Sequence, residues 1–285
     1  HESTSDWEER PQTLFKATKY GDDSDRALKK SDGSWTYFAG DLAYHLHKLR
    51  RGYDQLLNIF GCDHIGYIKR LKAAVFALSG KSDILEVKAS QLVNFLDNGQ
   101  PVRMSKRAGN FITIADVVDR VGRDATRFMM ISRHQDVMID FDFQKVIEQS
   151  KDNPIFYIQY AHARICSVLR HAGKKTDDAD IVNAALDTLD DIHEFEMLKI
   201  LCDYPRQIDM SARMLEPHRM CTYLYDVASC FHSLWNAGKT NTTLRFLDPE
   251  NTERTHARLA LISGVATVLQ SGLELLGITP VEEMH

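Results

Sequence analysis

Cysteine is scarce in this sequence: there are five in 285 residues, and no two of them form a Cys-x-x-Cys pair. An odd number without paired spacing argues against a disulfide framework and against a structural zinc site. We therefore expect no protein-bound structural metal, and a reducing compartment, the cytoplasm, as the location.

Long apolar runs are absent as well. The first ten residues are polar and acidic, which is not the pattern of a signal peptide. The most apolar stretch spans residues 259–278, and it contains side chains that are costly in hydrocarbon, namely Ser263, Gln270, Ser271 and Glu274. The stretch predicts a helix inside a bundle, so we expect no membrane partner.

The chain also lacks the excess of positive charge that is common in nucleic-acid-binding proteins. Its net charge is −5. Residues 1–150 carry 22 Lys and Arg against 21 Asp and Glu, and the remainder carries 13 against 19. Contacts to RNA must then come from local clusters, which could equally be solvated faces. The candidate clusters are Lys48-Arg50-Arg51, Lys69-Arg70-Lys72, and Arg170 with Lys174-Lys175.

The first half of the chain alternates short apolar runs with helical stretches. An apolar run at 55–60 ends at Gly61, a helix is expected over about 65–78, and 84–87 suits a second strand. Strand, helix, strand is the order of a parallel α/β sheet. A hairpin is predicted from a strand at 92–96, a turn at 97–100 and a strand at 101–103, before a helix that begins near Ile114.

The second half reads as helical throughout. Pro154 opens a helix whose apolar residues recur at 3-to-4 spacing, and Pro217 opens another that is closed by Gly238. Asp248-Pro249 ends a polar loop before the last helix. We predict two domains: residues 1–145, α/β, and residues 146–285, an all-α bundle.

Several motifs carry a resemblance to a known family. Val102–Asn110 sets Met104-Ser105-Lys106 among clustered cations in a loop, which resembles the KMSKS loop of class I aminoacyl-tRNA synthetases. Further motifs resemble arginyl-tRNA synthetases of bacterial type, and they occur in that family's order: 21–26, 35–45, 61–67, 149–154 and 157–164.

The resemblance implies a fold and a reaction. The expected fold is the C-terminal part of a Rossmann-type catalytic domain, lacking the half with the His-x-Gly-His signature and the N-terminal domain, followed by an anticodon-binding bundle. The expected reaction is ATP-dependent activation of L-arginine, with Mg²⁺ accompanying ATP, and transfer to arginine tRNA. The intact enzyme is expected to be a monomer. His64-Ile65-Gly66-Tyr67 is no substitute for the missing signature, since Met104 follows it by only 40 positions.

Candidate residues for the small substrates follow from the same resemblance. Lys106 and Ser105 are the predicted catalytic residues, because an ammonium in a closing loop can meet the charge of departing pyrophosphate. The predicted ATP-binding residues are Gly61, Asp63, His64, Met104, Ser105, Lys106 and Arg107. The family's first lysine and last serine are replaced here by Arg103 and Arg107.

Arginine, with its planar cationic group, calls for a carboxylate and an aromatic surface. Tyr37 and Asp41 lie one helical turn apart and are the predicted arginine-binding pair. The plainer alternative makes Tyr37 a core residue and Asp41 a first-turn residue favoured by the helix dipole. Likewise, residues 61–64 could be a simple strand-to-helix turn with Asp63 as N-cap.

In the helical half, aromatic and cationic side chains could stack on unpaired bases. The predicted tRNA-binding residues are Tyr157, Arg164, Tyr223 and Trp235, among several aromatic residues of which most must be core.

Two other functions stay open. One is a catalytically inactive fragment that binds tRNA or ATP. The other is a different class I-like nucleotidyltransferase, which the helical half disfavours. A cysteinyl-tRNA synthetase is disfavoured by the lack of zinc-ligand spacing.

Overall fold

The structure is a computed structural model that describes residues 13–102 and 111–284. The chain divides into two compact units. The first comprises the residues up to Leu92 together with Gln135–Met138, and the second comprises Val93–His134 and Ile139–His285.

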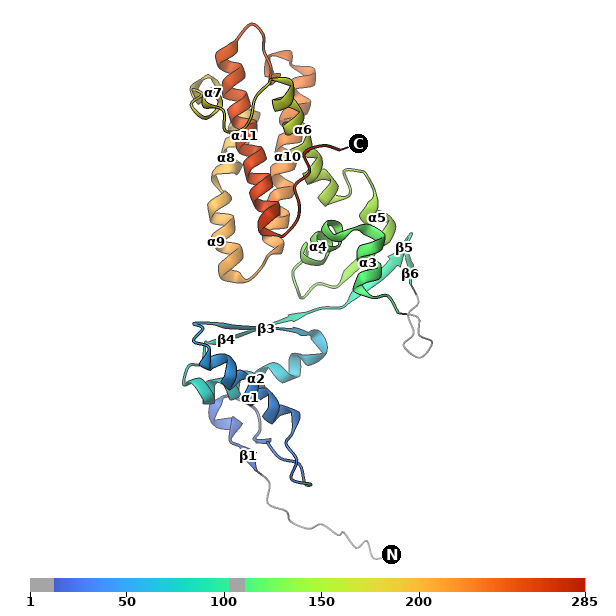
Figure 1. Cartoon of the computed structure of the whole chain (residues 1–285), viewed down its shortest axis with the longest axis vertical. Helices are drawn as coiled ribbons and strands as arrows, with labels where there is room; N and C mark the ends of the chain where they lie inside the picture. Colours follow the sequence, from blue (N-terminus) through green and yellow to red (C-terminus); the bar gives the residue numbers. More distant parts are fainter. Residues whose placement is uncertain (1–12, 103–110, 285) are drawn as a thin grey trace, which may run out of the picture. The chain divides into compact units, whose positions relative to one another are not determined.

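The first unit is built around one βαβ element. Strand β3 (Leu56–Gly61) pairs in parallel with β4 (Leu85–Ser90), and α2 (Ile65–Ser79) connects them. Helix α1 (Tyr37–Arg50) packs against α2 (Figure 1). The remaining elements are short: β1 (Leu14–Phe15), η1 (Ala17–Tyr20), β2 (Arg26–Ala27) and η2 (Cys62–His64).

The core of this unit follows from strand alternation. Leu56, Leu85 and Val87 are buried, and Leu71 and Val75 of α2 pack on them. On β3 the intervening residues Leu57 and Ile59 are exposed, 41% and 70%. One face of the described pair of strands is therefore covered by α2, as the strand, helix, strand order predicted.

The second unit begins with a small sheet. Strand β5 (Val93–Asp97) turns through Asn98-Gly99, both at positive φ, into β6 (Gln100–Pro101). This confirms the predicted hairpin, with the turn type that Asn-Gly favours. Strand β7 (Ile139–Asp142), which the sequence analysis did not predict, pairs in parallel with β5. Three short helices accompany the sheet: α3 (Ile114–Val121), α4 (Arg123–Ile131) and α5 (Phe143–Ile147).

The rest of the second unit is a helical bundle, as predicted. Figure 1 shows α6 (Pro154–His171), α10 (His218–Thr240) and α11 (Thr252–Leu275) running alongside one another. Pro154 begins α6 as expected, whereas Pro217 is the N-cap of α10 and lies just outside it. The smaller elements are α7 (Ala179–Val182), η4 (Leu186–Thr188), α8 (Ile192–Cys202), α9 (Tyr204–Met214) and η5 (Thr242–Leu244).

The bundle core extends beyond the predicted boundary near residue 145. Phe128 of α4 is 1% exposed and belongs to the same apolar cluster as Ile158, Leu224 and Leu269. Next to it, the Arg127 guanidinium donates to the backbone carbonyl of Leu276. Helix α4 thus packs with the bundle, and the boundary near 145 stays a prediction.

Candidate functional site

A loop held by ion pairs forms one wall of a cavity in the first unit. Asp22 is buried and receives two hydrogen bonds from the Arg26 guanidinium, at 2.6 and 2.8 Å. These bonds hold the pKa of the Asp22 carboxyl below its usual value. Three residues along, Asp25 pairs with Lys16 at 3.0 Å. The charged motif at 21–26 therefore fixes its own loop.

Helix α1 forms the second wall, and its start is set by Thr36. The Thr36 hydroxyl accepts from the Ala39 amide at 3.3 Å and donates to the Ala27 carbonyl at 3.1 Å. This cap makes Tyr37 the first helical residue, so Tyr37 and Asp41 share one face. The Tyr37 side chain is 93% exposed. It is a free aromatic surface rather than a core residue.

Helix α2 supplies the third wall through residues spaced three apart. His64, Tyr67 and Arg70 lie on the same face and all line the cavity. The Tyr67 hydroxyl donates to the Asp41 carboxylate. Burial, and then this hydrogen bond, raise the pKa of Tyr67. The Arg70 guanidinium lies over the Tyr67 ring, 5.4 Å from its centroid.

The cavity that these walls enclose has a volume of about 750 Å³. It brings together three of the residues predicted to bind arginine or ATP, namely Tyr37, Asp41 and His64. The other lining residues were not predicted to belong to it; they are Asp25, Arg26, Ala27, Lys30, Thr36, Phe38, Tyr67 and Arg70. In the sequence, positions 64, 67 and 70 are spaced three apart at a predicted helix start. This spacing could have indicated that the three side chains lie on one face of the helix.

A buried polar network ties α1 to β3 directly beneath Asp41. His45, 3% exposed, bonds through Nδ1 to the Asp41 carbonyl at 2.8 Å and through Nε2 to the Asn58 amide nitrogen at 2.9 Å. A carbonyl only accepts, so Nδ1 carries the proton and Nε2 accepts from Asn58. The Lys48 ammonium donates to the other end of the Asn58 amide at 2.8 Å. The network fixes the turn of α1 that carries Asp41.

Gly61 and Asp63 lie where β3 ends. The Asp63 carboxylate stands close over Gly61, so that a Cβ at position 61 would lie 2.6 Å from its Oδ1. The Asp63 and His64 side chains are exposed and approach to 3.6 Å. In the structure, His64 rather than Asp63 is the N-cap residue of α2. Binding of ATP by Gly61, Asp63 and His64 stays a prediction, as does binding of arginine by Tyr37 and Asp41.

The predicted loop residues Met104, Ser105, Lys106 and Arg107 lie outside the residues that the structure describes. Their assignment to catalysis and ATP binding therefore rests on the sequence alone.

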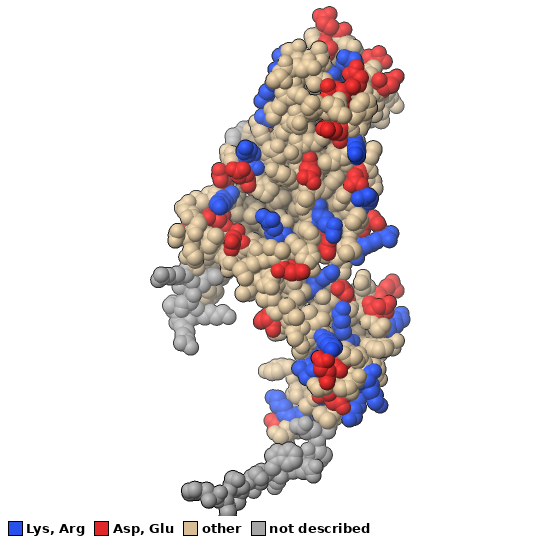
Figure 2. Space-filling view, turned by 180° about the vertical axis from the view of Figure 1, so that it is seen from behind, with Lys and Arg blue, Asp and Glu red and all other residues tan. Residues whose placement is uncertain are grey.

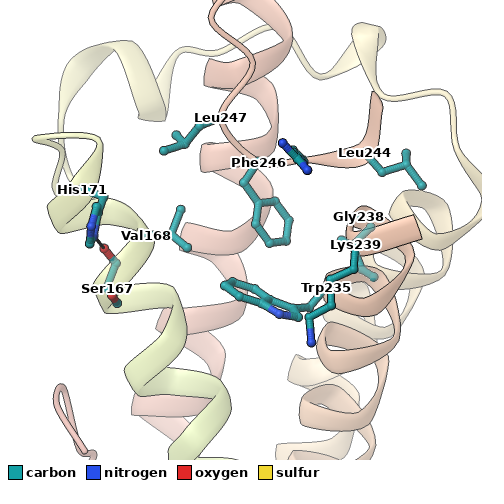
Figure 3. Close-up of a pocket in the computed structure, with 11 residues that line it drawn as sticks. Ser167, Val168, His171, Trp235, Gly238, Lys239, Leu244, Phe246 and Leu247 are labelled. Carbon is teal, nitrogen blue, oxygen red and sulfur yellow. Dashed lines mark hydrogen bonds between the residues drawn. The ribbon is translucent and has the colours of Figure 1, made fainter. Parts of the chain in front are cut away.

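The bundle contains a second cavity, of about 520 Å³. Figure 3 shows Trp235 of α10 and Phe246, from the segment after η5, facing the same hollow, with Val168 and His171 on the α6 side. The rings of Trp235 and Phe246 are 5.9 Å apart. Lys239 and Arg245 add cationic groups to the lining. An aromatic surface flanked by cations suits a planar, anion-bearing ligand.

Three of the four predicted tRNA-binding side chains are close together. The Arg164 guanidinium lies 4.8 Å from the Trp235 ring centroid, and the Tyr157 ring lies 4.4 Å from that of His232, which Arg164 also approaches. Tyr223 is different: it is 5% exposed, and its hydroxyl donates to the Ile200 carbonyl at 2.8 Å. In this packing the Tyr223 ring is not available for base stacking.

The charged surface agrees with the low net charge. On the face shown in Figure 2, Lys and Arg side chains are intermingled with Asp and Glu. Among the residues in the described ranges, no group of three or more His, Cys, Asp or Glu is arranged to hold a metal ion. Within the same ranges, no helix is both long enough and apolar enough to cross a membrane.

Comparison with known sequences identifies the relatives of the chain. Residues 158–284 match the family of the DALR anticodon binding domain. An arginine–tRNA ligase from Rhodospirillum rubrum is 54% identical over 286 aligned positions, which cover 98% of this chain and 48% of that protein. One from Parvibaculum lavamentivorans is 50% identical over 100% of this chain and 49% of its own length. The chain thus spans about half the length of the curated relatives it matches.

Solved structures agree with these matches. A crystal structure from Campylobacter jejuni assigned to the arginyl-tRNA synthetases is 33% identical, with a TM-score of 0.85, and the alignment covers 98% of this chain and 59% of that one. The arginyl-tRNA synthetase of Thermus thermophilus shares the fold at 22% identity, with a TM-score of 0.78 over 95% of this chain and 53% of that one. In its motifs, its fold and these relatives, the chain is similar to arginyl-tRNA synthetases, and it corresponds in length to about half of a curated arginine–tRNA ligase.

Proposed function

We propose that this chain is part of an arginine–tRNA ligase that activates L-arginine with ATP, accompanied by Mg²⁺, and transfers it to arginine tRNA in the cytoplasm, acting as a monomer. The observation that carries the proposal is the cavity of the first unit, where Tyr37 and Asp41 stand together on α1. Relatives named arginine–tRNA ligase, about half identical over nearly the whole chain, support the reaction.

Arginine would enter this cavity with its guanidinium toward Asp41. A carboxylate can accept two parallel hydrogen bonds from a guanidinium, and the exposed ring of Tyr37 offers a face for the same planar group. The neighbouring carboxylates of the 21–26 loop already form ion pairs: Asp22 pairs with Arg26, and Asp25 pairs with Lys16. Asp41 is then the carboxylate of the lining that can meet a cationic substrate.

ATP would lie beyond the end of β3, near Gly61, Asp63 and His64, because ligands of parallel α/β sheets bind outside the carboxyl ends of the strands. Met104, Ser105, Lys106 and Arg107 would meet the phosphates by resemblance to the family's loop. The reaction needs positioning and charge stabilisation more than covalent catalysis, so one well-placed ammonium is expected to matter.

The bundle would bind the tRNA through its cavity and the aromatic group beside it. Trp235 and Phe246 offer stacking surfaces, and Arg164, Lys239 and Arg245 offer charge to the backbone of an unpaired strand.

Arginine-dependent exchange of pyrophosphate into ATP, with arginine tRNA present, tests the function. In the full-length enzyme that carries this sequence, Asp41→Asn should raise the KM for arginine about tenfold or more, since a charge-assisted hydrogen bond is lost. The KM for ATP should change little. Absence of exchange from a folded full-length wild type would refute the proposal, while equal loss for both substrates would remove Asp41 from arginine binding.

The chain taken alone gives a second result. If it is folded but shows no exchange, it is competent at most to bind tRNA or ATP, as an inactive portion of the enzyme would.

A further inference from the structure

The Tyr67 ring is held in place on several sides. Phe38 meets it edge-on with ring centroids 6.2 Å apart, Phe60 lies 6.5 Å away, and the Arg70 guanidinium covers it at 5.4 Å. Tyr67 lies on the first turn of α2, which follows β3 after the short helix η2. The phenolic hydroxyl therefore has a fixed position, in contrast to the exposed ring of Tyr37.

That hydroxyl donates to one oxygen of the Asp41 carboxylate. A carboxylate has two oxygens with about four acceptor positions, so one donor leaves room for a bidentate guanidinium. The backbone under Asp41 is held separately by the His45 network. Backbone and carboxylate are thus fixed by two independent sets of hydrogen bonds.

Resting on the proposed function, we infer that Tyr67 is a positioning residue for arginine: its hydroxyl orients the Asp41 carboxylate for the incoming guanidinium. A free aspartate side chain loses rotamer freedom when it binds, and a donor that already holds it in place reduces this cost. Tyr67 also lines the cavity, so the hydrogen bond lies at the edge of the binding space. Phenylalanine at position 67 would keep the packing of the ring but would lose the hydroxyl that orients the Asp41 carboxylate.

The test compares Tyr67→Phe with the wild type in the full-length enzyme, using arginine-dependent exchange. We expect the KM for arginine to rise about tenfold, as for a lost hydrogen bond to a charged group, with the KM for ATP within roughly twofold. Tyr20→Phe is the matched control, because Tyr20 also packs its ring on α2, edge-on against Phe76 at 5.5 Å. It should leave both constants unchanged.

A double-mutant cycle separates positioning from a merely structural role. If Tyr67 acts through Asp41, Tyr67→Phe should have no further effect on the KM for arginine in the Asp41→Asn background. An equal effect in both backgrounds would overturn the inference, as would a loss of ATP binding or of thermal stability that accounts for the whole defect. An unchanged KM in the single variant would overturn it as well.

Failure of the proposed function looks different. In that case the wild type shows neither exchange nor calorimetric binding of arginine. The contact between Tyr67 and Asp41 can then be tested by following the ionisation of the Tyr67 phenol with pH. The signal is the difference in phenolate absorbance between a protein and the same protein carrying Tyr67→Phe. Asp41→Asn should let Tyr67 ionise at lower pH, because the negative charge that opposes the phenolate is gone. No change would show that the two side chains are not paired.

Discussion

At the scale of single residues, His232 shows how burial changes the chemistry of a side chain. It is 5% exposed, its Nε2 lies 3.3 Å from the Tyr157 carbonyl, and its Nδ1 lies 3.4 Å from an Arg164 nitrogen. Arginine only donates and a carbonyl only accepts, so the ring is neutral with the proton on Nε2. Burial lowers the pKa of His232 to about 4.

This lowered pKa predicts a loss of stability in mild acid. The unfolded chain takes up the proton near pH 6.5 and the folded bundle only near 4, so stability falls as the pH drops through that window, by no more than about 3 kcal/mol. Urea unfolding between pH 7 and 4.5 measures the slope, which His232→Gln should flatten. Aspartates whose pKa is lowered from the ordinary value of 3.8, such as Asp191, lose their contribution to stability only as the pH falls below that value. The same dependence of stability on pH in His232→Gln as in the wild type would contradict this account. His171→Gln is the control for the loss of an imidazole as such, and it should keep the wild-type dependence.

At the scale of elements, a buried ion pair joins α8, α11 and the segment after η5. Glu194 and Arg258 are 0% and 2% exposed and meet at 2.7 Å. Glu194 also accepts the Asp190 and Asp191 amides at 3.0 and 3.1 Å, and Arg258 donates to the Arg245 carbonyl at 3.0 Å. Both Glu194 carboxylate oxygens, and Nε and Nη1 of Arg258, thus have hydrogen-bond partners, which is the condition under which a buried ion pair is tolerated.

Removing one partner should therefore be severe. We expect Arg258→Met to lower the free energy of unfolding by about 3–5 kcal/mol, because Glu194 is left buried without a counter-charge. Arg213→Ala is the matched control: Arg213 pairs with Asp209 at 2.8 Å, but its side chain is 77% exposed, and the expected loss is below about 1 kcal/mol. Equal losses in chemical denaturation would show that burial does not govern the two pairs.

At the scale of the whole molecule, the division of the chain by contacts differs from the boundary near residue 145 that the sequence pattern predicts. Helix α4 contributes Phe128 to the bundle core, and the Thr279 amide donates to the Asp124 carboxylate at 3.0 Å. Contacts divide the chain at about 92, with residues 135–138 returning to the first unit. Sequence periodicity did not indicate this, because α4 is short and joined to the bundle only in three dimensions.

Two truncations test which division is physical. Residues 93–285 should unfold cooperatively, and residues 146–285 should be less stable by several kcal/mol, since loss of a buried phenylalanine alone costs about 3–5. Phe128→Ala within 93–285 should account for much of the difference in melting temperature. Equal stability of the two truncations would instead favour the boundary near 145.

The sequence by itself determined several local elements and the resemblance to a known family. Asn98-Gly99 fixed a hairpin, Pro154 a helix start, and the 3-to-4 spacing of apolar residues a bundle, because each depends on neighbours along the chain. The Tyr37 and Asp41 pair could be placed on one face for the same reason: it needs only a helix that begins at Tyr37.

Only the tertiary structure decided which side chains meet across elements. The Tyr67 hydroxyl bonds to Asp41, 26 positions away in the sequence, and β7 pairs with β5, more than 40 positions away. Tyr223 is buried, and its hydroxyl bonds to the Ile200 carbonyl. Burial and long-range partners depend on how helices and strands pack, and no periodicity encodes that packing. The sequence indicated the chemistry of the site, and the fold determined which residues hold it in place.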